Sequence, residues 1–183
     1  MVVVGALMGA QGEFLITATL VDGAEATLRI LRPEDYNAVV SLAVCLSAEE
    51  RYLRFFTMHP AHIGDWALSL TKPEHGIVAL GAFESGELIG VANYAELTRP
   101  GECEIAVVVA HEQHERGVGT ALLKALGHIA RVAGQHRFIA DVLFENVAMR
   151  RVLHDAGWPL TQHRDGPVLS IELDIDATEA PTP

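Results

Sequence analysis

The stretch Val107 to Thr120 reads VVVAHEQHERGVGT and decides how the rest of the chain is interpreted. An apolar run typical of a buried strand ends at Ala110, and a helical period of apolar residues begins at Gly117. Glycines at positions 117 and 119 permit positive φ and a close approach of the backbone to a ligand. The amino end of a helix offers unpaired N–H groups and a partial positive charge. We therefore expect a phosphate-binding turn here, although a Gly-x-Gly pair by itself is more often a plain tight turn.

Two other phosphate-binding motifs do not fit this segment. A Walker A loop needs a Lys directly after its last glycine, and Thr120 follows Gly119. A dinucleotide fingerprint needs a third glycine, and Leu122 stands in its place. The segment therefore predicts a phosphate cradle of a different kind.

The segments on both sides of the turn predict one α/β domain. Outside it, the expected elements are a hairpin around Asp22-Gly23, helices at 33–46 and 47–56, a helical turn at 65–70, strands at 76–83, 87–97 and 102–110, a helix at 117–133, a strand at 137–144, a helix from its cap Asn146 through Asp155, and strands at 158–163 and 168–173. This order predicts a sheet of mixed direction with helices on both faces.

Composition narrows the class of protein. The 183 residues suit one domain with a single core, and 13 Lys and Arg against 24 Asp and Glu give a formal charge of −11. Domains that bind nucleic acid are usually basic, whereas an acidic field attracts amines and Lys-bearing surfaces. Two cysteines cannot build a disulfide framework, and no segment reads as a membrane span or signal peptide. We expect a cytoplasmic protein with no nucleic-acid or membrane partner.

The ends of the chain are expected to lie outside the folded unit. We expect residues 1–16 to form an N-terminal extension, residues 17–175 the domain, and residues 176–183 a disordered tail that is polar and contains proline. The apolar run Met1 to Ala10 has no clear assignment: packing on the sheet, contact with a partner and disorder all stay open.

Two motifs together resemble the GNAT superfamily of acyl-CoA-dependent N-acyltransferases. The family marks its pyrophosphate loop with Gln/Arg-x-x-Gly-x-Gly/Ala, and this chain has HERGVG at 114–119, with His in the first place. The family's Asn-containing strand-to-helix junction is matched by NVAMRRVL at 146–153, and its terminal Gly-aromatic pair by Gly157-Trp158. Residues 18–35, 46–56, 104–109 and 146–151 further resemble bacterial protein lysine acetyltransferases of the Pat type.

The resemblance implies a mixed, mostly antiparallel GNAT-like sheet that binds acetyl-CoA as cosubstrate. In the family, the strand corresponding to Val107–Val109 splays from its neighbour and pairs with the pantetheine amides, while the glycine turn holds the pyrophosphate. Arg116 can add charge there, and the Asn at 146 contacts the pantetheine arm as well as capping its helix. The residues so implied to bind the cofactor are Val107, Val108, Val109, His114, Glu115, Arg116, Gly117, Val118, Gly119, Thr120 and Asn146.

The resemblance also makes Glu104 the general base. A Lys amine has a pKa of about 10.4, so a base must take its proton at neutral pH. Glu104 opens an apolar strand, three residues before the valines, and burial there would raise the pKa of its carboxyl group. A solvated strand-end charge is the alternative, with Glu102 on the same strand face as the fallback base. Many GNAT enzymes protonate the leaving thiolate with a Tyr, but Leu153 occupies that position, which leaves water as the acid.

No metal site is predicted. His59 and His62 share the spacing of His111 and His114, but Pro60 interrupts the first pair, and no Cys or carboxylate pattern completes either. Cys103 lacks the base and orienting group that a nucleophile needs, so we expect a buried structural thiol.

Three functions stay open at this level. The first is an N-acetyltransferase that acts on a protein lysine, possibly of an AMP-forming acyl-CoA synthetase, by direct transfer in a ternary complex. The second transfers the acetyl group to a small amine. The third is a non-catalytic sensor that binds acyl-CoA.

Overall fold

The computed structural model describes residues 3–8, 14–55, 62–72 and 75–177. The strands in this part of the chain are β1 (Val3–Met8), β2 (Phe14–Thr19), β3 (Glu25–Ile30), β4 (Ile77–Glu84), β5 (Glu87–Glu96), β6 (Glu102–Val109), β7 (Arg137–Leu143), β8 (Leu160–Asp165) and β9 (Val168–Asp174). The helices are α1 (Tyr36–Cys45), α2 (Ala48–Phe55), α3 (Ile63–Thr71), α4 (Val118–Val132) and α5 (Val147–Asp155), with short 3₁₀ turns η1 (Pro33–Asp35) and η2 (His111–Gln113). Each predicted element is therefore present, with ends that shift by a few residues.

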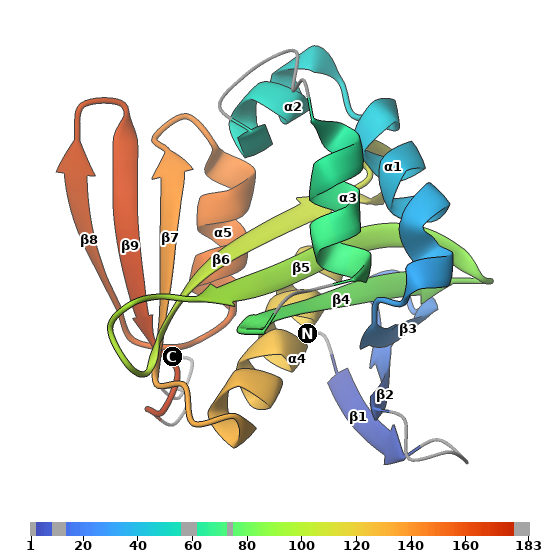
Figure 1. The fold of residues 1–183 in the computed structure, drawn as a ribbon, viewed down its shortest axis with the longest axis horizontal. Coiled ribbons are helices and arrows are strands. Elements are labelled where there is room, and N and C mark those ends of the chain that lie inside the picture. The colour runs from blue at the N-terminus through green and yellow to red at the C-terminus, as the bar shows by residue number, and fades with distance from the viewer. Residues whose placement is uncertain (1–2, 9–13, 56–61, 73–74, 178–183) are drawn as a thin grey trace.

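The described strands form one sheet in the order β1-β2-β3-β4-β5-β6-β7-β9-β8 (Figure 1). Neighbouring strands run antiparallel everywhere except at β6 and β7, which are parallel. This confirms the predicted mixed, mostly antiparallel α/β fold.

Helices cover both faces of the sheet, as predicted (Figure 1). On one face, α1 and α3 close a smaller core around Val39, Leu70 and Val108. On the other, the apolar side of α4 packs into the larger core with Leu122, Leu126 and strand residues. α4 has a 3.6-residue apolar period, and such a stripe is buried when a helix lies against a sheet.

The parallel pair β6–β7 opens soon after it begins. The two strands pair from Glu102 with Arg137 to Glu104 with Ile139, and no further. β6 nevertheless continues to Val109, and its other edge stays paired with β5 along this length. In the described chain, no strand therefore meets residues 105–109 on the β7 side, and a gap opens between the two halves of the sheet.

The N-terminal residues include part of the sheet. β1 pairs with β2 from Val3 opposite Thr19 to Met8 opposite Phe14, so the expected boundary at residue 16 falls inside β2. At the other end, the carboxylate of Asp174 accepts bonds from the backbone of Asp176 and Ala177. The rest of the predicted disordered tail, residues 178–183, lies outside the described residues. Within the described chain, no helix is both long and apolar enough to cross a membrane.

Candidate active site

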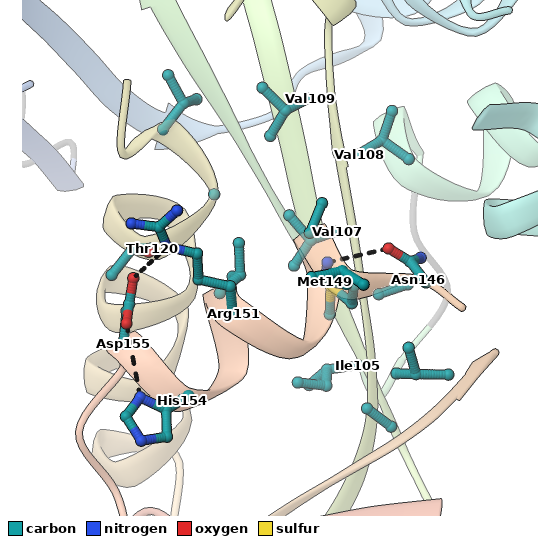
Figure 2. Close-up of a pocket in the computed structure, with 18 of the residues that line it drawn as sticks. Ile105, Val107, Val108, Val109, Thr120, Asn146, Met149, Arg151, His154 and Asp155 are labelled. Carbon is teal, nitrogen blue, oxygen red and sulfur yellow. Dashed lines mark hydrogen bonds and ion pairs between the residues drawn. The ribbon is translucent and has the colours of Figure 1, made fainter. Parts of the chain in front are cut away.

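A cleft of about 1590 Å³ lies where β6 and β7 part. One wall is β6 from Ile105 to Val109, and the other is α5 with the end of β7 (Figure 2). The turn before α4 closes one end, and α2 borders the cleft near Glu104. Ligand sites in proteins commonly measure about 300–1,000 Å³, so this space suits a long, extended ligand.

The three valines line the cleft while their side chains anchor the strand. Val108 is buried in the core beneath α1, whereas Val107 and Val109 pack against the core on the α4 face. Because β7 has diverged, the main-chain edge of these residues faces the cleft and not a neighbouring strand. The structure therefore leaves backbone groups of this edge without a partner among the described strands at the cleft, and the carbonyl oxygen of Val109 lies 3.1 Å from Nε2 of His114.

The glycine turn has the backbone that the sequence predicted. Gly117 is the N-cap of α4 with φ of 85°, and Glu115 also has positive φ, at 61°. His114, Glu115, Gly117, Val118, Gly119 and Thr120 all line the cleft. The first N–H groups of α4 lie at its end, where an anion is favoured.

Gly119 also serves the packing of α5. A Cβ placed there would lie 3.0 Å from Cγ2 of Val152 and 3.6 Å from Cγ2 of Val109. The second glycine thus lets α5 and α4 approach each other closely at the wall of the cleft.

The Arg116 side chain does not line the cleft, which corrects the expectation that its charge faces a phosphate. Its Nε donates to Asp22 at 2.5 Å, and Nη2 donates to Glu84 at 2.7 Å, with Gln113 as a further partner. Hydrogen bonds from Arg116 hold the pKa of Glu84 and of Asp22 below the ordinary range. The guanidinium therefore braces the β2–β3 and β4–β5 turns against the loop before α4, and the turn is positioned by this ion-pair network.

Other cations line the cleft instead. Lys124 on α4, Arg151 on α5 and Arg54 on α2 are all in its walls, and Arg151 lies 3.7 Å from Asp155 (Figure 2). None of these three residues was among those predicted from the sequence to bind the cofactor. Helical spacing could have indicated one, because Lys124 lies four residues after Thr120 and so shares its side of the helix.

Asn146 caps α5 and lines the cleft at the same time. Its Oδ1 accepts a hydrogen bond from the backbone N–H of Met149 at 3.0 Å (Figure 2). This confirms the predicted N-cap. The side-chain amide N–H groups are not used in the cap, so the second predicted role is compatible with the first.

Glu104 stands where the two strands separate, since it is the last β6 residue paired with β7. Its side chain is exposed at the cleft, which corrects the expectation that burial would activate it. The half-buried Arg54 lies nearby: burial lowers the pKa of Arg54 to about 10, while the Glu104 charge acts in the opposite direction. Arg54 thus stays cationic at neutral pH and offers Glu104 a positive neighbour.

The fallback base is placed differently. Glu102 lies outside the cleft, 3.1 Å from Arg99 and 3.4 Å from Arg137. Its carboxylate is held in ion pairs, so Glu104 is the better-placed of the two.

Two further expectations concern unreactive groups. Cys103 is fully buried, and burial raises the pKa of its thiol to about 12, which confirms a structural role. Leu153, which stands where many GNAT enzymes have an acidic Tyr, is also fully buried in the core. Its hydrocarbon side chain cannot protonate a leaving thiolate.

One histidine pair does find a carboxylate. Glu50 of α2 lies beside His111 and His114, which corrects the expectation that nothing completes this pair. His59 lies outside the described residues, so the first pair has no structural account.

The geometry agrees with comparisons to known proteins. A model of the acetyltransferase (GNAT) domain matches residues 25–158. The chain belongs to the GNAT acetyltransferase family.

Several proteins similar to this chain are named as acetyltransferases. The chain is 30% identical to the GNAT domain of S. lividans PAT, with a TM-score of 0.77 over 87% of this chain and 96% of that one. It is 28% identical to an acetyltransferase of Pseudomonas aeruginosa over 79% of this chain and 80% of the relative. It is 27% identical to the acetyltransferase Pat of Mycolicibacterium smegmatis over 81% of this chain, but it spans less than half of that relative, 45%. A Salmonella typhimurium protein solved with acetyl-CoA shares the fold at 20% identity, with a TM-score of 0.70 over 86% of this chain and 98% of that one.

Proposed function

We propose that this GNAT protein is an acetyl-CoA-dependent N-acetyltransferase that modifies a protein lysine, with Glu104 as general base. One observation carries the proposal: the main-chain edge of Val107–Val109, the turn before α4 and Glu104 all border one cleft. A thioester held along β6 would end beside a carboxylate, with its phosphates at the turn.

The binding part of the proposal uses the chain's own backbone and cations. The free edge of β6 pairs with the pantetheine amides, and the amide of Asn146 holds the same arm from the α5 side. The pyrophosphate lies at the N–H groups of Val118, Gly119 and Thr120. Lys124 and Arg151 supply the positive charge that Arg116 does not.

The transfer proceeds by direct attack in a ternary complex. Glu104 takes a proton from the acceptor ammonium, and the neutral amine forms a C–N bond to the thioester carbonyl carbon. A β6 N–H group stabilises the oxyanion of the tetrahedral intermediate. The carbonyl re-forms as the C–S bond breaks, the nitrogen loses its second proton to water, and CoA leaves as a thiolate that water protonates.

The exposure of Glu104 and the negative charge of the chain favour a protein lysine as the acceptor. Glu104 is exposed, so a side chain that projects from another protein can reach it. The net charge of −11 favours an approaching cation, and the Pat-type resemblance points to protein acceptors such as AMP-forming acyl-CoA synthetases. A reducing cytoplasm is the proposed setting, because both cysteines are free thiols.

The test measures CoA release and acetyl-CoA binding separately. Wild type, Glu104→Gln and the control Glu87→Gln, an exposed glutamate outside the cleft, are offered acetyl-CoA with an acyl-CoA synthetase, other lysine-bearing proteins and small amines. We expect Glu104→Gln to lose about 10²–10⁴-fold in kcat while its Kd for acetyl-CoA stays within a factor of about three. The control should match wild type in both.

Each other result removes a defined part of the proposal. Turnover with small amines alone would mean that the acceptor is a small amine and not a protein lysine. A fully active Glu104→Gln variant would remove the base assignment. Failure of the wild type to bind acetyl-CoA would overturn the assignment of the cleft itself.

A further inference from the structure

Three side chains that commonly bind metals converge at one wall of the cleft. Glu50 lies in α2, His111 lies in η2, and His114 is the residue directly after η2. One ligand atom from each lies within 4.8 Å of the other two, and in the described chain this is the one such group of three. Glu50 and His111 are 61 residues apart, so the tertiary fold brings them together.

The distances between these ligand atoms are close to those of a small metal site. Oε1 of Glu50 lies 2.8 Å from Nδ1 of His111 and 3.5 Å from Nε2 of His114. Zinc binds nitrogen and carboxylate oxygen at about 2.0–2.2 Å, which places two ligand atoms in a tetrahedral site about 3.3 Å apart. Both imidazoles thus approach the same carboxylate oxygen, and each of these two distances is within about half an ångström of metal-binding spacing.

The carboxylate is held in a suitable orientation by its own helix. Oε2 of Glu50 accepts from the backbone N–H of Ser47 at 2.8 Å, and Oγ of Ser47 accepts from the N–H of Glu50 at 3.1 Å. This capping box occupies the second oxygen and leaves Oε1 directed at the histidines. Hydrogen bonds that orient a ligand in this way are typical of metal sites.

The three side chains are partly exposed, so an ion and a further ligand can reach them. The side chain of Glu50 is 14% exposed, that of His114 is 38% and that of His111 is 74%. A partly open site gives the ion a route in and lets water complete the coordination. His114 would exchange its contact with the carbonyl oxygen of Val109, 3.1 Å from Nε2, for the metal.

We propose that Glu50, His111 and His114 form a binding site for Zn²⁺ or a similar first-row divalent ion, with water as a further ligand. Two imidazole nitrogens and one carboxylate oxygen are a donor set that zinc favours, whereas Mg²⁺ and Ca²⁺ prefer oxygen donors alone. The bound ion joins α2 to the loop before α4, which are two walls of the cleft.

The alternative is a hydrogen-bonded cluster without a metal. In that case His111 donates to Glu50, His114 donates to Val109, and both contacts account for the geometry. The two possibilities differ in what a carboxylate-to-amide change does. A glutamine at position 50 can keep the capping box with its one oxygen and donate from its amide to the other ring tautomer of His111, but it is a poor zinc ligand.

The experiment uses tag-free, chelator-treated full chain with Co²⁺ as a spectroscopic probe and Zn²⁺ in calorimetry. Wild type, Glu50→Gln and His111→Ala are compared with the control His163→Ala, an exposed histidine of β8. We expect one ion per chain, a visible Co²⁺ band of a low-coordinate site, and a Tm rise of about 5–10 °C when Zn²⁺ is at 100 times its Kd. Both cluster variants should weaken Zn²⁺ binding by at least about tenfold, and the control should not.

Two results would overturn the site. One is the absence of a stoichiometric Zn²⁺ event in wild type, and the other is a Glu50→Gln variant that binds Zn²⁺ as tightly as wild type. The circular dichroism and Tm of Glu50→Gln in chelator establish that the variant is folded. These measurements do not depend on acetyl-CoA turnover, so they test the metal site independently of the proposed function.

Discussion

Gly127, inside α4, is the position where a single methyl group is most informative. In an exposed helix interior, Gly→Ala stabilises a protein by about 1 kcal/mol. At position 127, however, an added Cβ would lie 2.3 Å from Cη2 and 2.6 Å from Cζ2 of Trp158. Trp158 is only 5% exposed, and its ring meets the edge of Phe138 with centroids 6.0 Å apart. Gly127 and Trp158 therefore form a close-packed contact between α4 and the segment that joins α5 to β8.

The magnitude follows from two opposing effects. An ordinary carbon–carbon contact is about 3.5–4.0 Å, so the indole or the helix would have to move by more than about 1 Å. Overpacking of this kind costs about 1–3 kcal/mol, and the surrounding core favours the upper part of that range. After subtraction of the helix-propensity gain, we expect Gly127→Ala to lower the free energy of unfolding by about 1–2 kcal/mol. For a chain of this length that is a fall in Tm of about 3–6 °C.

The assay is thermal and urea unfolding of four proteins: wild type, Gly127→Ala, Trp158→Phe and the double variant. Phenylalanine lacks the two indole atoms that the new methyl group would meet. The double variant should therefore be more stable than the sum of the single changes predicts, by about 0.5–3 kcal/mol. A Tm for Gly127→Ala equal to or above that of wild type would refute the reasoning, as would strict additivity in the cycle.

Three further changes test other parts of the structure. Burial alone would raise the pKa of Asp35, but hydrogen bonds from Arg29 and from the backbone outweigh it and leave the pKa lowered. The stability that this carboxylate contributes is therefore full above about pH 4 and is lost as pH falls through the lower pKa of the folded state. The Tm advantage of wild type over Asp35→Asn should shrink below about pH 4. Asn146→Ala should cost about 1 kcal/mol through the lost cap, whereas Asn146→Asp should keep the cap and weaken acetyl-CoA binding, which unfolding and calorimetry separate. Arg116→Ala should lower Tm yet leave the salt dependence of acetyl-CoA binding unchanged, while Lys124→Ala should reduce that dependence; the reverse pattern would return Arg116 to the phosphate site.

Short-range signals in the sequence predicted the local structure well. The hairpin at Asp22-Gly23 and the capping box of Ser47 and Glu50 are both present, and Asn146 caps α5. Each signal depends on groups within a few residues of one another, so its energy is already contained in the local chain. The motif at 114–119 likewise indicated a turn with positive φ, because that backbone requirement is local to the glycine.

The direction of long side chains could not be predicted in the same way. Arg116 was expected at a phosphate, but its partners Asp22 and Glu84 come from two distant hairpins. Glu104 was expected to be buried because its strand is apolar, yet its side chain is exposed at the point where the β6–β7 pairing ends. The cluster of Glu50 with His111 and His114 was missed because its spacing in the sequence has no regular period.

By itself, the sequence determined the order of elements, the mixed sheet, the glycine turn and the identity of the family-like motifs. Those follow from periodicity, capping and backbone conformation, which are properties of neighbouring residues. The tertiary structure alone decided that the β6–β7 pairing ends at Glu104, which cations face the cleft and which carboxylate meets the histidines. These depend on contacts between segments tens of residues apart, and such contacts exist only once the sheet and its helices have packed together.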